Sequence, residues 1–512
     1  MGGTLILTLI VLWACIPVYF GSLAHQRSYP DRLPVWFIDM DGSDIGNAMR
    51  TAVQANINTN TEAKLGWIIK DASNFPTVTD VSNQIIDERA WAALVVSRNA
   101  TSKLISAREN GDASYDPSTA MVFLYNQARN ELATNSFIVP FSQALISSAA
   151  ANFAASYASH YLASQSGNAT AMAALIAAPQ TLTAPISYSM NNLRPYSAAV
   201  ASALTVVGSI YTIIFAFLIT ISGYGIRQAI EPYLKIKDLL LLRVLAPPIF
   251  YLPISFAYCM VSLCFKVPLM RGASFPTELH PAPPSCFSSV FIRYDRAGGF
   301  FIFWLYNFMG MAALGFSTEA MITLITAKYM SYFLIPLVRH ACLATPSMSN
   351  TTEYLMSVQI ICNVAVASLP ITLEPWFYKY GYGFPVYNMA QATRTIIFNT
   401  KSHLGLNAGI LIAWIALSCL TIPLFSFIMR RGDMLAAARE ATSIAQKHNN
   451  YTDCNSIDGI SPAQETLDIS KNNNANANPE VTPLDEKDPG HDYDPPVLQY
   501  QSHEIFDVEH QP

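Results

Sequence analysis

The sequence predicts a polytopic α-helical membrane protein of about six spans, with an exoplasmic α/β domain between spans one and two and a disordered carboxy-terminal tail. Three observations support this fold class. Only 13% of the 512 residues are charged, whereas a typical soluble domain has about a quarter. Hydrophobic residues make up 52% of the chain, and several apolar runs are long enough to cross ~30 Å of hydrocarbon. Between the first two runs the pattern changes to alternating strands and helices.

The first apolar run is uncharged and extends from Thr4 to Phe20. We interpret residues 1–20 as a transmembrane anchor, at the short end of the usual length for a span. Small residues at Ser22-Leu23-Ala24 also have the spacing of a signal-peptidase site. The absence of Lys and Arg before the run favours an uncleaved anchor, and cleavage remains the alternative.

Residues 21–197 predict a water-facing α/β domain. Apolar runs indicate strands at 35–42 (ending in a turn), 65–69, 92–96 and 121–125. Helical spacing appears at 44–57, 81–90 and 102–110, and an Ala/Ser-rich, mostly helical region covers 133–178 with a break near Ser166-Gly167. No cysteine lies between Gly21 and Ala199, which excludes a disulfide framework there.

Two sequons lie in this domain. Asn99-Ala-Thr101 and Asn168-Ala-Thr170 are candidate N-glycosylation sites, which would indicate a non-cytosolic face. A third sequon, Asn450-Tyr-Thr452, lies in a tail that we place in the cytoplasm.

Residues 198–431 predict a membrane domain of five further spans. These are 198–221, 244–264, 300–326, a divided fifth span at 329–338 and 360–373, and 408–427. With the amino terminus inside, the connecting loop at 227–243, Lys328 and Arg430-Arg431 are cytoplasmic, as the positive-inside rule prefers. The predicted outer loops also contain several basic residues, so the charge bias is incomplete.

Three polar residues stand inside the predicted spans. Glu319 and Asn307 share the fourth span, and Asn363 lies in the fifth. A carboxylate at that depth is costly and should face protein, water or a partner, or be protonated. Glu319 therefore belongs either to a translocation path or helix-packing clamp, or to the cytoplasmic helix end, where it reaches the interface. Asn363 can form hydrogen bonds across helices.

The segment from Glu374 to Asn407 connects the last two apolar stretches and is rich in aromatic residues. Trp376, Tyr380 and Tyr382 have apolar rings with one polar tip, and such residues settle at the membrane–water boundary. We predict a membrane-skimming connection, in which Arg394 and Lys401 bind lipid headgroups or act as interfacial anchors. The alternative is an ordinary surface loop.

Residues 432–512 predict a largely disordered cytoplasmic tail. The chain after Arg431 holds 15 acidic and 4 basic residues, against 20 acidic and 26 basic residues before it. The Asn/Asp/Pro-rich composition cannot bury a core. Such a tail has a role in trafficking or regulation, or in solubility alone.

Catalytic and cofactor motifs are absent from the sequence. It has no Gly-x4-Gly-Lys-Ser/Thr loop, His-Glu-x2-His, Cys-x2-Cys or Gly-x-Ser-x-Gly pattern. Asp39 and Asp41 follow a strand and could hold a cation, although such residues more often stabilise a turn or cap a helix. We therefore expect no enzymatic activity, no cofactor and no metal.

Several motifs between residues 8 and 431 carry a family resemblance. They are Tyr19–Leu23, Ala90–Val96, Tyr125–Asn130, Leu193–Tyr196, Gly298–Asn307, Met311–Gly315, Tyr380–Pro385 and Arg394–Lys401. With these motifs the chain resembles the fungal nitrosoguanidine-resistance membrane protein family. It is more distantly similar to the membrane domains of type-2 ABC exporters and to bacterial phage-infection proteins.

The chain departs from the family pattern in three places. It lacks the cytoplasmic segment that usually precedes the first span. Residues 271–290 and 338–359 are extra, and joining Leu337 to Ile360 would restore a continuous fifth span. We hypothesise that one or both pieces are retained introns in the gene model, which sequenced transcripts containing both would refute.

The resemblance implies a plasma-membrane protein that contributes to drug resistance by transport, or by modulating lipid or drug transport. Its energy would come from an ion gradient or a separate ATPase. The alternative is a non-transporting regulator or scaffold that alters lipid asymmetry through a flippase or another transporter. Membrane lipids are the expected contacts, a homodimer is a further possibility, and nucleic acid is not expected as a partner.

Overall fold

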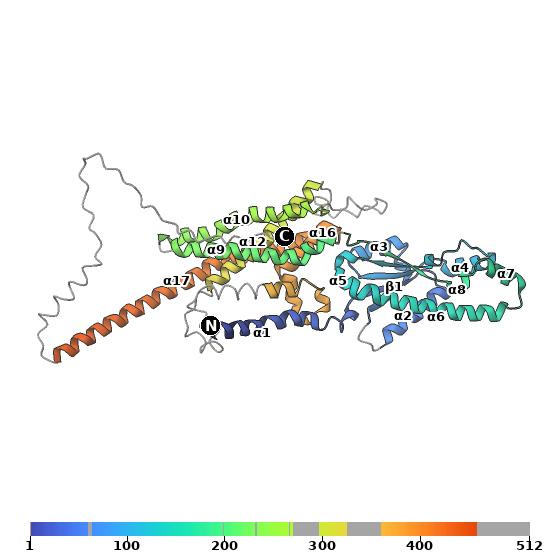
Figure 1. Cartoon of the computed structure of the whole chain (residues 1–512), viewed down its shortest axis with the longest axis horizontal. Coiled ribbons are helices and arrows are strands. Elements are labelled where there is room, and N and C mark those ends of the chain that lie inside the picture. Colours follow the sequence, from blue (N-terminus) through green and yellow to red (C-terminus); the bar gives the residue numbers. More distant parts are fainter. Residues whose placement is uncertain are drawn as a thin grey trace, which may run out of the picture. The chain divides into compact units, whose positions relative to one another are not determined.

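The computed structural model describes residues 2–59, 64–197, 199–230, 233–265, 267–269, 296–324 and 360–457. Both predicted extra pieces, 271–290 and 338–359, and the first half of the divided fifth span lie outside these residues. The chain separates into two compact units, Met1–Asp433 and Met434–Pro512, which are described separately. The first unit contains a sheet and a set of long helices (Figure 1).

A five-stranded mixed sheet forms the centre of the α/β domain. The strand order is β2-β1-β3-β4-β5, in which β1 is parallel to β2 and β3, and β4 is antiparallel to β3 and parallel to β5. The strands are β1 Pro34–Asp39, β2 Gly66–Lys70, β3 Ala92–Val96, β4 Met121–Tyr125 and β5 Tyr188–Asn192. The sequence analysis predicted the first four and missed β5, whose residues are Tyr-Ser-Met-Asn-Asn.

Helices cover both faces of this sheet, as an alternating strand–helix pattern requires. Helices α2 (Asp44–Asn58), α4 (Ala100–Asn110) and α6 (Val139–Gln165) cover one face, and α3 (Val78–Ile86) covers the other. Because successive strand residues point to opposite faces, Leu94 and Val96 pack on the first side, whereas Val95 packs on the second.

Helix α6 continues from α5 (Glu131–Ala133) through the π-helical turn η5 (Thr134–Ile138). Its buried Ile146, Ala149 and Phe153 belong to the core beneath the sheet. The predicted break at Ser166-Gly167 is present, since α7 covers Ala169–Ala177. The short elements of this domain are η1 Pro30–Arg32, η2 Ala72–Asn74, η3 Pro117–Ala120, η4 Gln127–Arg129 and α8 Gln180–Thr183.

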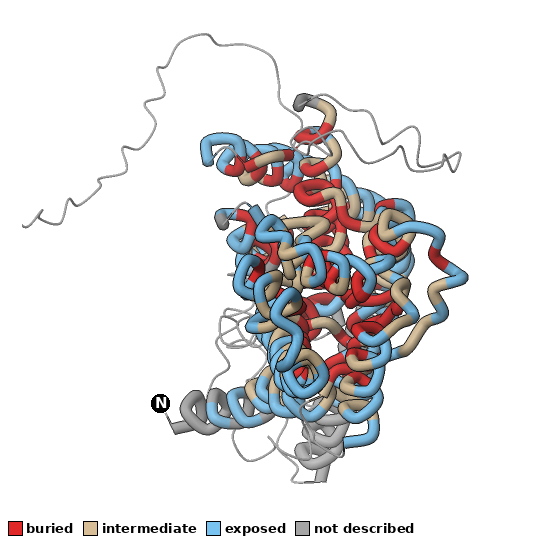
Figure 2. The backbone as a smooth tube through the Cα atoms, turned by 90° about the vertical axis from the view of Figure 1, so that its right-hand side faces the viewer, coloured by how far each residue is buried: buried red, intermediate tan, exposed pale blue. Residues whose placement is uncertain are grey.

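The remaining long helices of the described chain include a bundle around α12. They are α1 Gly2–Ala24, α9 Gly208–Ile230, α10 Ile236–Cys264, α12 Arg296–Leu324, α16 Pro385–Phe398 and α17 Leu404–Ile457, and α9 follows η6 Ala199–Ala201 and η7 Ala203–Val207. Helix α12 packs against α9, α10 and α16. Buried residues concentrate where elements pack together, and exposed ones lie on the outside (Figure 2).

Five stretches of the described chain are long and apolar enough to cross a membrane. They are Glu131–Gln165, Ala203–Arg227, Ile236–Cys264, Gly298–Thr323 and Leu404–Gly432. The last four coincide with the predicted second, third, fourth and sixth spans. Glu131–Gln165 was predicted as part of the α/β domain, and it contributes to the core of that domain. The predicted first anchor is helical within α1.

The structure corrects the sequence prediction at three places. Arg227 and Arg243 lie inside α9 and α10, and not in a connecting loop. The second half of the predicted fifth span is not one helix, because residues 360–365 are helical and turns and the short η9 (Ile371–Leu373) follow. The predicted disordered tail begins as helix, since α17 extends to Ile457. Residues 458–512 lie outside the described chain.

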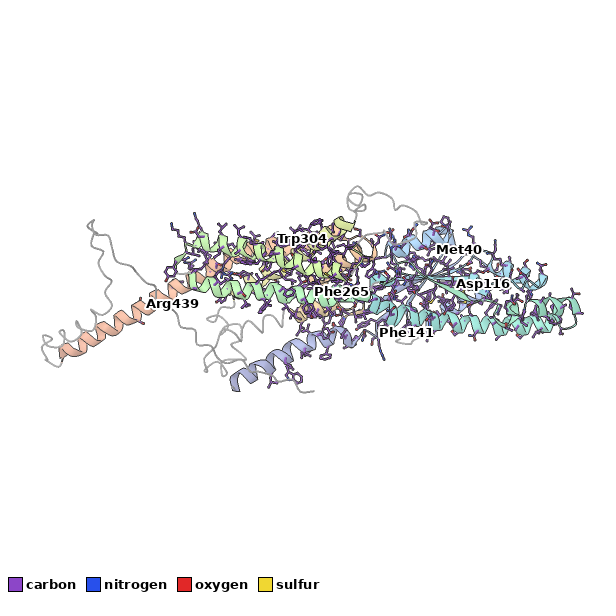
Figure 3. All side chains as sticks on the ribbon, turned by 45° about the horizontal axis from the view of Figure 1, so that its top comes forward. Met40, Asp116, Phe141, Phe265, Trp304 and Arg439 are labelled. Atoms are coloured by element: carbon purple, nitrogen blue, oxygen red, sulfur yellow. The ribbon has the colours of Figure 1, made fainter. Side chains whose placement is uncertain are left out.

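Close packing of α10 and α12 depends on one glycine. A Cβ atom at Gly315 would collide with the Tyr251 hydroxyl, which lies 3.1 Å from Thr220 Oγ1 of α9. One turn of α10 further on, Ser255 accepts a hydrogen bond from Trp304 Nε1 of α12 at 3.1 Å. Trp304 is labelled within the bundle, whereas Met40 and Asp116 belong to the α/β domain (Figure 3).

We predict that Gly315→Leu destabilises the bundle. The new side chain must displace buried Tyr251, and overpacking of this kind costs roughly 1–3 kcal/mol. Thermal melting of the detergent-solubilised protein should show a lower midpoint for this variant. The matched control is Gly225→Leu, because nothing lies within 4 Å of a Cβ built at Gly225 on α9. Equal melting midpoints for the two variants would contradict the packing described here.

Candidate functional site

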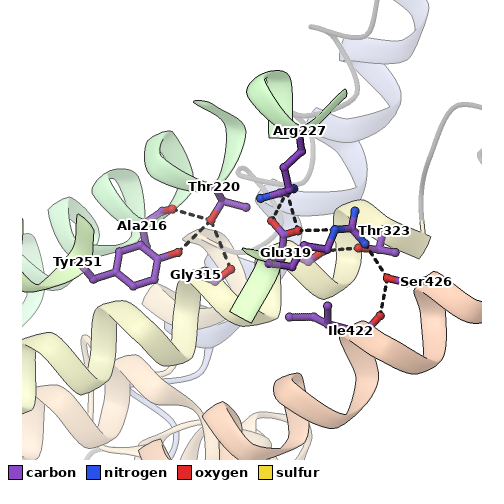
Figure 4. Close-up of polar contacts among 10 residues, drawn as sticks. Ala216, Thr220, Arg227, Tyr251, Gly315, Glu319, Thr323, Ile422 and Ser426 are labelled. Carbon is purple, nitrogen blue, oxygen red and sulfur yellow. Dashed lines mark hydrogen bonds and ion pairs between the residues drawn. The ribbon is translucent and has the colours of Figure 1, made fainter. Parts of the chain in front are cut away.

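The most unusual polar group in the bundle is a carboxylate shared by two guanidinium groups. Glu319 of α12 receives a hydrogen bond from Arg227 Nη2 of α9 at 2.6 Å, and Arg243 Nε of α10 lies 3.4 Å from Glu319 Oε1. The side chains of Arg227, Arg243 and Glu319 are 6%, 7% and 1% exposed. We call these residues, together with Ser426, the charge cluster (Figure 4).

Ser426 connects a fourth helix to the charge cluster. Its hydroxyl accepts a hydrogen bond from Arg243 Nη1 at 2.6 Å and donates to the Ile422 carbonyl of α17 at 2.7 Å. Helices α9, α10, α12 and α17 are therefore joined through one carboxylate and its partners. A shift of one helix along its axis would break at least one of these contacts.

The sequence analysis placed Glu319 either in a translocation path or helix-packing clamp, or at the cytoplasmic helix end, where it would reach the interface. Glu319 lies in the interior against two arginines and does not reach outward at the helix end. Sequence reasoning treated Arg227 and Arg243 as loop residues, so it missed both partners. A signal was available, because each arginine lies within a few residues of an apolar run and the fourth run contains a lone carboxylate.

A row of buried hydroxyl groups leads along α9 toward the charge cluster. Thr212 and Thr220 are 1% and 2% exposed, and Ser209 is also buried. Each hydroxyl donates to the carbonyl one turn earlier, at 2.8–3.0 Å. We call Ser209, Thr212 and Thr220 the hydroxyl row. Small residues at this face let α9 approach α12 closely.

The other two predicted residues, Asn307 and Asn363, make contacts outside the charge cluster. Asn307 is buried on α12, twelve residues before Glu319. This separation corresponds to about 18 Å along the helix. The Asn307 amide donates to the Phe303 carbonyl at 2.8 Å. Asn363 is also buried, and its Oδ1 accepts from the Val386 backbone N–H at 3.5 Å. It therefore bonds to the first turn of α16.

The aromatic segment has an inner and an outer side. It forms η10 (Trp376–Gly383), an eight-residue 3-10 helix. Trp376 is 78% exposed and Tyr382 46% exposed. Tyr380 is half-buried and donates to the Cys362 carbonyl at 3.1 Å. Buried Tyr378 donates to the Val18 carbonyl of α1 at 2.7 Å.

The structure contradicts the predicted contact between Arg394 and lipid headgroups. Its side chain is 2% exposed, and Nη2 lies 3.3 Å from Glu131 Oε2 at the start of α5. Nearby, Arg194 Nε donates to the Asn399 carbonyl at 2.9 Å, and the rings of Tyr196 and Phe398 are 4.5 Å apart. Contacts of this kind join the α/β domain to α16 and its C-cap. We call the six residues involved the domain junction: Glu131, Arg194, Tyr196, Arg394, Phe398 and Asn399. Lys401 is partly exposed.

The remaining predicted residues lie in the α/β domain. Asp39 Oδ1 accepts from the backbone N–H groups of Asp41 and Gly42 at 3.0 and 2.9 Å. Asp41 accepts from the backbone and hydroxyl of Thr101. These oxygens therefore serve a turn and the start of α4. Asn99 and Asn168 are both exposed.

Glu374 was not singled out by the sequence analysis. It is 1% exposed, and neither carboxylate oxygen has a hydrogen-bond partner in the described chain. Its backbone carbonyl accepts from Arg32 Nη1 at 3.1 Å. The residue lies between η9 and η10, outside the five long apolar stretches. Burial raises the pKa of its carboxyl from 4.5 to about 8.

Comparison of the sequence with known proteins identifies a matching family and a distant relative. The family described as "Protein of unknown function (DUF3533)" matches residues 4–348 and 341–420, a region that includes the sheet, Glu319 and the aromatic segment. Among the relatives is an uncharacterized endoplasmic reticulum membrane protein of Saccharomyces cerevisiae. It is 22% identical over 446 residues, which cover 81% of this chain and 77% of the relative. No solved structure matches the chain.

We predict that Glu319→Met destabilises the protein more than removal of the whole charged set. The single change leaves two buried cations without their carboxylate, and breaking a buried ion pair costs roughly 3–5 kcal/mol. The triple variant Arg227→Met/Arg243→Met/Glu319→Met replaces the set with apolar side chains and should recover most of that loss. Thermal melting of wild type, single and triple variants measures this. A triple variant no more stable than Glu319→Met would refute the ion-pair interpretation.

We predict that Glu374 makes stability depend on pH. Between pH 4.5 and about 8 the folded protein holds a proton on Glu374 that the unfolded chain releases. Raising the pH therefore favours unfolding, and the free energy of unfolding falls by about 1 kcal/mol per pH unit until the slope ends near the folded pKa.

The test is the thermal midpoint of wild type, Glu374→Gln and Glu109→Gln from pH 5.5 to 8.5. Glu374→Gln should lose this fall and be the more stable protein at pH 8. The exposed control Glu109→Gln should keep it. Parallel pH profiles for wild type and Glu374→Gln would show that the carboxyl is already ionised at low pH.

Proposed function

The chain belongs to the family of proteins of unknown function DUF3533, and we propose that it contributes to nitrosoguanidine and drug resistance by moving amphipathic molecules through its bundle. It is a membrane protein, since a relative is named as one and the chain has several long apolar helices. The more specific role rests on the resemblance to nitrosoguanidine-resistance proteins and to export permeases. We propose that energy comes from an ion gradient or a separate ATPase.

The charge cluster is the observation that carries this proposal. Replacing a buried ion pair with apolar residues is often neutral or stabilising, so stability alone is a weak reason for three charged residues in an apolar bundle. Ionisable residues inside membrane segments commonly serve function. Glu319 also has two cationic partners on two helices. We propose that a transport cycle would use these two contacts in turn, with the carboxylate keeping one arginine while the other is released.

A second candidate function is a non-transporting regulator or scaffold that acts on lipid asymmetry through a flippase or another transporter. The hydroxyl row favours this candidate. Each hydroxyl has a carbonyl acceptor on its own helix, and Thr220 also contacts the Tyr251 hydroxyl and the Gly315 carbonyl. These groups are therefore already occupied within the protein and are poorly placed to solvate a substrate. In this role the charge cluster would act as a clamp.

We propose that the α/β domain is exoplasmic and that residues 198–431 form the membrane domain. The stretch Glu131–Gln165 then stays outside the bilayer, because its buried face packs beneath the sheet. We propose the plasma membrane as the location. The yeast relative is named as an endoplasmic reticulum protein, and microscopy of a fluorescently tagged chain distinguishes the two membranes. We also propose that the protein has no enzymatic activity. A homodimer is a further proposal.

We predict that the Arg227→Met/Arg243→Met/Glu319→Met variant is abundant but does not restore resistance. A strain lacking the gene would express wild type, the triple variant or Glu109→Gln, at matched levels, on plates with graded nitrosoguanidine. Wild type and the exposed control should restore growth, and the triple variant should not. Full resistance from the triple variant would assign the charge cluster to structure alone. Efflux from proteoliposomes then separates transport from regulation, because a regulator moves nothing by itself.

We predict that Asn168 is glycosylated. Its side chain and Thr170 are exposed at the start of α7, whereas the Thr101 hydroxyl of the other sequon is buried against Asp41. Endoglycosidase treatment should increase gel mobility of the wild type but not of Asn168→Gln. Asn450→Gln should behave as wild type if the tail is cytoplasmic. A mobility shift lost only in Asn450→Gln would invert the proposed topology.

A further inference from the structure

We propose that η10 is an aromatic foot that inserts into the headgroup region of a bilayer containing anionic lipid. The foot consists of the exposed residues Trp376, Phe377, Lys379 and Tyr382. The inference requires that the bundle is in a membrane, but it does not depend on the proposed transport role.

The first argument is that the exposed aromatic side chains are held in place. Trp376 and Phe377 are 78% and 56% exposed, whereas their neighbour Tyr378 is 6% exposed and bonded to α1. Gly381 is buried and leaves no space for a Cβ beside Val366. The inner face is therefore fixed to two other segments. An apolar outer face on a fixed element indicates an apolar partner.

The second argument is the position of the foot along its neighbouring helices. Tyr378 contacts Val18, six residues before the end of α1, which corresponds to about 9 Å of helix. Trp414 Nε1, ten residues into α17, donates to the Gly383 carbonyl at 2.7 Å. The foot thus lies beside apolar helices and not beyond their ends. In a membrane that contains these helices, the exposed side of the foot would therefore face lipid.

The third argument is that backbone groups of the foot are paired within the protein, some of them with each other. The Tyr378 N–H donates to the Pro375 carbonyl at 3.0 Å, and the Phe384 N–H donates to the Gly381 carbonyl at 3.0 Å. A segment that enters the apolar boundary must pair its backbone groups internally. An ordinary surface loop has no such need.

Charge selects the lipid class. Residues 375–403 contain no Asp or Glu, and their Lys and Arg residues are Lys379, Arg394 and Lys401. Arg394 pairs with Glu131, so Lys379 and Lys401 are the cations left toward the surface. Lys side chains extend along apolar surface and place the ammonium group among phosphates. An acidic headgroup therefore fits this face better than a neutral one.

The experiment uses the full chain in nanodiscs of phosphatidylcholine, with and without phosphatidylserine. Lipids with a quencher near the headgroup report tryptophan depth by fluorescence. Trp376→Phe should lose the component quenched by these lipids. Trp36→Phe is the matched control, since Trp36 is 7% exposed in the sheet, and it should keep that component. Lys379→Gln should remove the difference between the two lipid compositions.

Three results would overturn the proposal. Unchanged quenching in Trp376→Phe would show that the foot does not touch lipid. Quenching of Trp376 that is equal in both lipid compositions would remove the anionic preference. Protection of Trp376 from lipid, with a photo-crosslink from position 376 to a second copy or another protein, would assign the foot to a protein interface.

Discussion

A carboxylate and two guanidinium groups share one point among four apolar helices, and the arrangement of the bundle depends on it. Charges removed from water must find partners with good geometry, or the fold loses several kcal/mol. Glu319, Arg227 and Arg243 meet that requirement only when α9, α10 and α12 keep their register. Apolar contacts resist sliding through the fit of their side chains, as at Gly315 and Tyr251. The ion pairs add a directional requirement, because sliding would separate the charged groups.

The same constraint appears where the α/β domain meets the bundle. Arg394 is fully buried and needs Glu131, which stands at the start of the continuous helix α5–η5–α6. Helix α16 therefore has an ionic contact to the α/β domain. It also packs closely on α12, where Met389 occupies the space beside Gly310. Helix α12 also carries Glu319. Packed elements thus connect the α/β domain, through α16, to the helix that carries Glu319.

The sequence predicted elements well where one pattern dominates, and poorly where partners are distant. Strand β3 is Ala-Ala-Leu-Val-Val and buried throughout, so its pattern is unambiguous. Strand β5 contains Asn and Ser and is fixed by pairing with β4, which no local pattern reveals. Glu319 was identified, because a carboxylate in an apolar run is conspicuous. Its partner Arg227 lies 92 residues away, and Glu131 lies 263 residues from Arg394. Basic residues near the ends of predicted spans suggest a connecting loop or a contact with lipid headgroups. The sequence alone does not show that the fold places an acidic side chain beside them.

The most direct test of this account is the distance from the Glu319 carboxylate to arginine nitrogens in a lipid bilayer. Solid-state NMR dephasing between ¹³Cδ of glutamate and ¹⁵Nη of arginine measures it, and subtraction of the Glu319→Gln spectrum isolates this residue. The account predicts strong dephasing, reduced in Arg227→Lys, because Arg227 Nη2 lies 2.6 Å from the carboxylate. A Glu319 signal without dephasing would contradict the charge cluster and the arrangement of helices built on it.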